Sequence, residues 1–215
     1  MAHLSLVKSL SRLQEEQRYT DEILLESFGL GFIRGTVVEI SGGPSTGKTS
    51  LALSLLAQLT AAGEICAAVD ACGGFDPCSA VLAGVELENL LWVRCGGDVE
   101  RAFIAADHLV QAKGFGAIWL NLHGLAQNKL RMVPKTYWFR YRTRIKETPT
   151  ILLVTAAEHV TGSASQSTFV FDRERTFWSG SGKFKLLREF SIRSRSPKFY
   201  SPPLPARVEM DYSKA

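Results

Sequence analysis

The chain has 215 residues, a length that suits one α/β domain and leaves little room for a second. Apolar residues make up 46% of it, as in a globular protein with an internal core. No window holds about 18 uncharged apolar residues, so the sequence predicts no membrane-spanning helix. The amino terminus lacks a basic region followed by a long apolar stretch, which favours a cytoplasmic protein over a secreted one. The 4 cysteines match no zinc-site spacing and are expected to be reduced thiols.

Charge is distributed unevenly along the chain, whose formal net charge is +4. Residues 1–110 contain 7 Lys and Arg against 14 Asp and Glu, a net charge of −7. Residues 111–215 contain 18 against 7, a net charge of +11. A basic half is typical of proteins that contact a polyanion or an acidic partner, and it also occurs in proteins that contact neither.

The apolar spacing predicts the elements in chain order. Residues 4–28 have helical spacing with a polar interruption, so a helical segment is expected over residues 1–29. Strands are predicted at 36–41, 65–70, 90–95, 116–122 and 150–155, and helices at 50–62, 77–83, 99–112 and 134–147. Residues 167–177 and 185–195 alternate as half-exposed strands do. This alternation predicts an α/β core over residues 30–212, with a mostly parallel sheet and helices on both faces.

A glycine-rich motif lies between the first predicted strand of this core and the helix that follows it. Its residues match G-x-x-x-x-G-K-[ST] in full and lead into Ser50: Gly42, Gly43, Pro44, Ser45, Thr46, Gly47, Lys48 and Thr49. Such a loop turns backbone N–H groups onto phosphate oxygens, and the helix terminus adds further donors. Lys48 suits the β- and γ-phosphates, and the Thr49 hydroxyl is a natural Mg²⁺ ligand. The sequence therefore predicts a P-loop NTPase domain that binds ATP with Mg²⁺.

Several short sequence segments outside this motif resemble the RecA recombinase family. They include residues 37–40, Asp76 followed by Pro77, residues 84–91, residues 192–195 and residues 208–211. The similarity extends over about residues 30–212 and implies a RecA-like ATPase core. It also implies that Asp76 contacts the adenine edge, and that Arg193 and Arg195 reach the ATP of a neighbouring subunit through self-association. A basic edge strand that deters pairing explains the two arginines equally well.

Four positions depart from the pattern of that family. Cys72 stands where the family has a water-activating glutamate, and Asn121 stands where a carboxylate supports Mg²⁺. Residues 154–156 lack the γ-phosphate-sensing glutamine, and Ser79 replaces the adenine-stacking tyrosine. A general base contributes about 10²–10⁴-fold to a rate, so the resemblance implies weak or absent hydrolysis. Whether the chain is an ATPase stays open at this point.

A short RecA paralogue with these departures resembles the ImuA family of the bacterial translesion mutasome. The DNA-contacting loops look short, and the chain stops where the C-terminal domain of RecA proteins would begin. This resemblance implies an assembly or regulatory subunit in the SOS response, acting in translesion synthesis or recombination with a mutasome partner. The alternative is an active DNA-dependent ATPase whose base is Asp70, Asp76 or Glu158. A small-molecule kinase is a third reading, but its lid motifs are not found.

Basic and aromatic residues are interleaved between residues 129 and 147. One interpretation is a surface for single-stranded DNA, formed by Lys129, Arg131, Lys135, Arg140, Arg142 and Arg144. The other is a crossover helix that buries Tyr137, Tyr141 and Ile145 and leaves its arginines in solvent. Trp138 and Phe139 fall outside that stripe, which predicts a partner-binding face for them.

Histidines are scattered rather than grouped. His108, His123 and His159 are isolated in the sequence. This favours surface or loop positions over a role as ligands.

Overall fold

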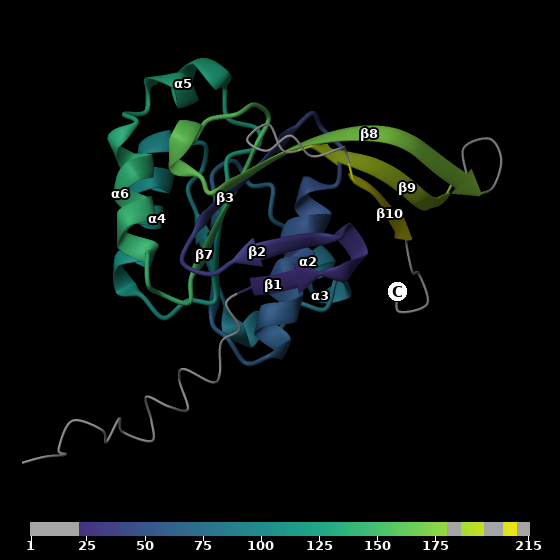
Figure 1. Cartoon of the computed structure of the whole chain (residues 1–215), viewed down its shortest axis with the longest axis horizontal. Helices are drawn as coiled ribbons and strands as arrows, with labels where there is room; N and C mark the ends of the chain where they lie inside the picture. The colour runs from purple at the N-terminus through teal and green to yellow at the C-terminus, as the bar shows by residue number, and fades with distance from the viewer. Residues whose placement is uncertain (1–21, 180–185, 196–203, 210–215) are drawn as a thin grey trace, which may run out of the picture.

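The structure is a computed structural model that describes residues 22–179, 186–195 and 204–209 (Figure 1). Residues 1–21 of the predicted helical segment lie outside the described residues. In the described part of the chain, no helix is both long enough and apolar enough to cross a membrane.

An eight-stranded sheet forms the centre of the protein, with the strand order β10-β9-β8-β3-β7-β6-β4-β5. Its strands are β3 (Val37–Gly42), β4 (Cys66–Asp70), β5 (Leu90–Arg94), β6 (Ala117–Asn121), β7 (Ile151–Ala156), β8 (Ser167–Ser179), β9 (Leu186–Arg195) and β10 (Leu204–Glu209). The six strands from β8 to β5 are parallel, and β9 and β10 continue the sheet in antiparallel pairs. The predicted α/β fold with a mostly parallel sheet is confirmed.

Helices cover both faces of this sheet (Figure 1). Helices α2 (Lys48–Ala61) and α3 (Pro77–Leu82) pack on one face, and α4 (Val99–Ala112), α5 (Gln127–Met132) and α6 (Thr136–Ile145) pack on the other. Short 3-10 turns occur at η1 (Glu26–Phe28), η2 (Leu87–Asn89) and η3 (Gly162–Ala164). Because both faces are covered, β3, β4, β6 and β7 are buried at every position, as expected of parallel strands.

The segment just before the core is a β-hairpin. β1 (Glu22–Leu25) pairs with β2 (Leu30–Ile33) in antiparallel register. Ile23 and Leu25 are buried and Leu24 is exposed, which is the two-residue period of a strand. The prediction of helix is therefore wrong for residues 22–25. The hairpin turns at Gly29, which has a φ of 60° that favours glycine.

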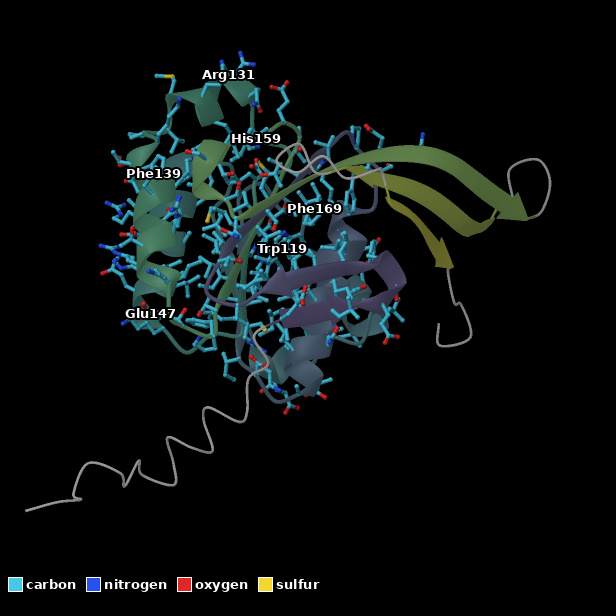
Figure 2. All side chains as sticks on the ribbon, viewed as in Figure 1. Trp119, Arg131, Phe139, Glu147, His159 and Phe169 are labelled. Atoms are coloured by element: carbon cyan, nitrogen blue, oxygen red, sulfur yellow. The ribbon has the colours of Figure 1, made fainter. Side chains whose placement is uncertain are left out.

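The basic segment after β6 contains two helices instead of one, because α5 precedes α6. Tyr141 and Ile145 are buried as predicted. Trp138 is also buried, and its ring meets Phe103 edge to face with 4.9 Å between centroids. The buried stripe of α6 is thus 138, 141 and 145, and the prediction of a partner-binding face is wrong for Trp138. Phe139 remains 46% exposed on the outer side of α6 (Figure 2).

Candidate nucleotide-binding site

The glycine-rich loop connects the end of β3 to the start of α2. At Gly42, an added Cβ would lie 2.4 Å from the carbonyl oxygen of Phe171 on the neighbouring β8, so a side chain does not fit. Gly47 has a φ of 86°, the left-handed conformation, and immediately precedes α2. These two glycines allow the chain to curl back between strand and helix. This is the predicted arrangement of strand, loop and helix.

Lys48 closes over this loop from the first position of α2. Its Nζ donates to the carbonyl oxygens of Gly42, at 2.6 Å, and Gly43, and to Thr46 Oγ1 at 3.1 Å. The side chain is 6% exposed, and this burial lowers the pKa of Lys48 to about 8. The loop therefore holds the ammonium group at the place where it would meet phosphate oxygens.

A cavity of about 150 Å³ opens above the loop. It is lined by residues 45–50 and by His123, which comes from the loop after β6. Thr49, the predicted Mg²⁺ ligand, is exposed, and Ser50 is half-buried. Gly43, Pro44 and Ser45 are exposed at the rim of the loop. Sequence reasoning missed His123, although its place just after a parallel strand was a usable signal, because ligands bind at the carboxyl ends of such strands.

Hydrogen bonds tie together the ends of β6 and β7 beside this cavity. Trp119 Nε1 donates to Thr155 Oγ1 at 2.8 Å, and Thr155 Oγ1 donates to Asn121 Oδ1 at 3.2 Å. The backbone N–H of His123 donates to the same Asn121 oxygen at 3.2 Å. Asn121 is 4% exposed, so its amide oxygen is occupied inside the protein. The side chain at the position of the family carboxylate therefore acts as a fixed acceptor.

Cys72 lies in the loop after β4, at the position of the family glutamate. It lines a different cavity of about 580 Å³, together with Arg94 and Arg101 near the ends of β4 and β5. Partial burial raises the pKa of the Cys72 thiol, and the charge of Asp70 raises it further. A thiol held in its neutral form is a poor proton acceptor, so Cys72 does not replace the glutamate.

Structural partners occupy two of the three carboxylates proposed as alternative bases. Asp70 is 1% exposed and accepts hydrogen bonds from the N–H groups of Gly73, Gly74 and Phe75. Glu158 forms an exposed ion pair with Arg131 at 3.3 Å. Among the described residues, the cavity of about 150 Å³ is lined by residues 45–50 and His123, so neither of these carboxylates lines it.

Asp76, predicted to contact the adenine edge, caps the amino terminus of α3. Its carboxylate accepts from the backbone N–H groups of Cys78 and Ser79 and from the Ser79 hydroxyl. The hydrogen bond from the Ser79 hydroxyl is the first cause of a lowered pKa at Asp76. Asp76 and Ser79 stand where the family has its adenine-contacting pair, and here they bind each other. The adenine contact of Asp76 stays a prediction.

The backbone of Arg193 and Arg195 lies in β9, two strands away from β3. Arg195 pairs with Val170 of β8, and Val170 pairs with Ser41, the residue before Gly42. Arg193 pairs with Asp172. Both positions are therefore close in register to the start of the glycine-rich loop, and their contact with a neighbouring subunit stays a prediction.

Most of the basic residues proposed to contact DNA have partners within the chain. Arg140 and Arg144 both bind Asp107 of α4, at 3.0 and 2.5 Å. Arg142 donates to the carbonyl oxygen of Ser163, and Arg131 pairs with Glu158. In the described part of the chain, Lys129 and Lys135 form no ion pair. The structure thus favours the crossover-helix interpretation for the arginines of α6, and DNA binding stays a prediction.

Comparison with known proteins finds similarity in the first part of the chain. Residues 18–122 match the family model of the RecA N-terminal domain. The chain is 41% identical over 87 residues to protein RecA of Picosynechococcus sp., covering 40% of this chain and 25% of that protein. It is 40% identical over 117 residues to protein RecA of Chloroflexus aurantiacus, covering 54% of this chain and 33% of that protein. A third relative, protein RecA of Borrelia duttonii, is 38% identical over 97 residues, which are 45% of this chain and 26% of the relative.

The chain spans a quarter to a third of the length of these curated relatives. The matched residues run from the segment before β1 to the end of β6, and so include the glycine-rich loop and Lys48. Residues 18–122 of this α/β protein are therefore similar to the RecA N-terminal domain and to the matching part of RecA proteins.

Proposed function

We propose that this protein is an ATP-binding, RecA-like member of the DNA damage response with weak or absent ATP hydrolysis. The proposal rests on a difference between residues at the carboxyl ends of the parallel strands. The glycine-rich loop and Lys48 are complete at the end of β3, whereas the ends of β4 and β6 offer Cys72 and Asn121. The affinity for phosphates rests on backbone donors and the lysine, and so it does not need the residues that were replaced.

The residues present fit a triphosphate with Mg²⁺. Gly42 leaves no space for a side chain, and the exposed Gly43 allows phosphate oxygens to approach the backbone. Lys48 would exchange its hydrogen bonds to loop carbonyls for phosphate oxygens, and Thr49 would hold Mg²⁺ through its exposed hydroxyl. Bound Mg²⁺ would neutralise phosphate charge at this site.

The same site supports hydrolysis poorly. Removing a general base costs about 10²–10⁴-fold in rate, and the neutral thiol of Cys72 does not accept the proton of an attacking water. The amide of Asn121 carries no negative charge, and its oxygen is already bonded to Thr155 and His123. We therefore expect bound ATP to persist.

A persistent nucleotide suits a protein that assembles with others. By resemblance to the ImuA family, the proposed role is an assembly or regulatory subunit in translesion synthesis or recombination, in the cytoplasm. Arg193 and Arg195 would then contact the nucleotide of an adjoining RecA-like subunit. An active DNA-dependent ATPase is the alternative. It is less favoured, because Asp70, Glu158 and most of the arginines that it would need are already bonded within the chain.

Nucleotide titration and turnover test this proposal together. Fluorescent ATP with Mg²⁺ should bind the wild-type chain, and Lys48→Ala should weaken binding at least tenfold. The control Lys113→Ala removes an exposed lysine at the end of α4 and should bind as the wild type does. Steady-state hydrolysis should stay near background with and without single-stranded DNA. A turnover as fast as that of RecA recombinases, and abolished by Lys48→Ala, would show that the chain is an active ATPase.

A further inference from the structure

His123 lines the cavity above the glycine-rich loop, and its imidazole can donate or accept hydrogen bonds. The pattern of the RecA family assigns no role to this position. It follows β6 by two residues and is exposed. Among the described residues, it is the one residue that lines this cavity from outside positions 45–50. Lys48 lines the same cavity. Desolvation lowers the pKa of His123, and the charge of Lys48 lowers it further.

The backbone around His123 is held in place by buried bonds. The His123 N–H donates to Asn121 Oδ1, and that oxygen also accepts from Thr155, which in turn accepts from Trp119. Asn121, Thr155 and Trp119 are all at most 4% exposed. The loop after β6 therefore leaves the sheet in a fixed direction, which places the imidazole at the cavity in the free protein.

The strand that would supply a phosphate sensor in the family offers none here. β7 ends in Thr155 and Ala156, and the Thr155 hydroxyl is turned toward Asn121 inside the protein. Lys48 is expected to serve the β- and γ-phosphates. In the described part of the chain, His123 is the side chain from outside the loop and α2 that shares the cavity with Lys48, so it is the candidate to reach the outermost phosphate.

We propose that His123 contacts the terminal phosphate of the bound nucleotide and makes the site prefer a triphosphate over a diphosphate. This inference rests on the proposed function, because it requires that the site bind nucleotide at all. An imidazole offers at least one N–H donor in either protonation state, so it bonds a phosphate oxygen directly. A diphosphate has no γ-phosphate to reach it, and the same side chain then adds nothing to affinity.

Paired titrations with the full chain test His123. The Mg²⁺ complexes of ADP and of the non-hydrolysable analogue AMP-PNP are titrated into wild type, His123→Ala, His123→Gln and the control His108→Ala. His108 is an exposed histidine on α4, far in sequence from the loop. A hydrogen bond to a charged group is worth about 10–100-fold in affinity. We expect His123→Ala to lose about tenfold or more for AMP-PNP and less than twofold for ADP.

Two further results separate a phosphate contact from a structural role. His123→Gln keeps an N–H donor and should recover part of the preference for AMP-PNP, while His108→Ala should match the wild type. Equal losses for both nucleotides in His123→Ala, or no loss for either, would overturn the inference and leave nucleotide binding intact. A wild-type chain that binds neither nucleotide would instead refute the proposed function, and the assignment of His123 with it.

Discussion

Glu39 offers a test of how the loop after β7 is attached to the sheet. Its carboxylate lies in β3, three residues before Gly42, and is 0% exposed. It accepts hydrogen bonds from the N–H groups of Val160 and Thr161 and from the Thr161 hydroxyl, and it pairs with His159 at 2.6 Å. One buried side chain therefore fixes three consecutive loop residues.

Replacing Glu39 by Leu would remove all of these acceptors while keeping an apolar side chain in the sheet. Two backbone N–H groups, those of Val160 and Thr161, would lose their partners inside the protein. Each buried donor without a partner costs about 1–3 kcal/mol, so we expect a loss of about 4 kcal/mol in the free energy of unfolding. Urea unfolding has a slope of about 2 kcal/mol per molar, so the midpoint should fall by about 2 M.

Milder variants keep this test decisive if Glu39→Leu does not fold. Glu39→Gln retains one acceptor oxygen and should lose less than Glu39→Leu. Thr161→Val removes a single hydroxyl donor and should lose about 1 kcal/mol. The reasoning would be refuted if Glu39→Gln and Thr161→Val both unfolded at the midpoint of the wild type, because the carboxylate would then contribute nothing to holding the loop.

Three other predictions concern thiols, the loop lysine and the basic surface. At pH 8 a thiol reagent should modify exposed Cys78 and spare Cys66, because burial raises the pKa of the Cys66 thiol to about 12 and leaves about one thiolate in 10⁴. Mass spectrometry of the native protein checks this, and labelled Cys66 would contradict it. Nucleotide affinity should weaken as the pH rises above about 8, because burial lowers the pKa of Lys48 to about 8 and the neutral amine no longer attracts phosphate. Lys48→Arg stays charged and should show a flat profile from pH 7 to about 9.5 in the same titration, whereas a flat wild-type profile would count against the lysine. Any affinity for single-stranded DNA should depend more on Lys129 than on Arg140, because Arg140 is paired with a carboxylate of α4. Fluorescence anisotropy at several salt concentrations measures this: the dependence of DNA affinity on salt should become less steep for Lys129→Ala. A larger effect of Arg140→Ala would contradict this ranking.

The parallel core and the glycine-rich loop could be predicted from the sequence because their signals are local. β3 and β7 are short apolar runs bounded by turn residues, and they are buried at every position as such runs predict. The motif around Lys48 depends on its own residues and on the strand and helix beside it. Both kinds of signal lie within about fifteen residues, so neither needs knowledge of tertiary contacts.

The hairpin and the stripe of α6 could not be predicted in the same way. Ile23, Leu24 and Phe28 fit a helical spacing and a strand–turn arrangement equally well, and pairing with β2 decides between them. Trp138 and Tyr137 are neighbours on α6, and which of them is buried depends on where Phe103 of α4 stands. Contacts between distant segments decided these cases, and they override local periodicity.

Packing does not account for the residues that replace the family's catalytic groups. Cys72 is exposed beside a cavity, so a longer side chain would have space there. Asn121 uses its amide oxygen to accept from Thr155 and His123, and a carboxylate oxygen would accept the same two bonds. The fold would thus tolerate a glutamate and an aspartate at these two positions. The hydrogen bonds and the space at these two positions therefore do not explain why Cys72 and Asn121 stand there, and their presence beside Lys48 agrees with the proposed function, in which nucleotide is held rather than hydrolysed.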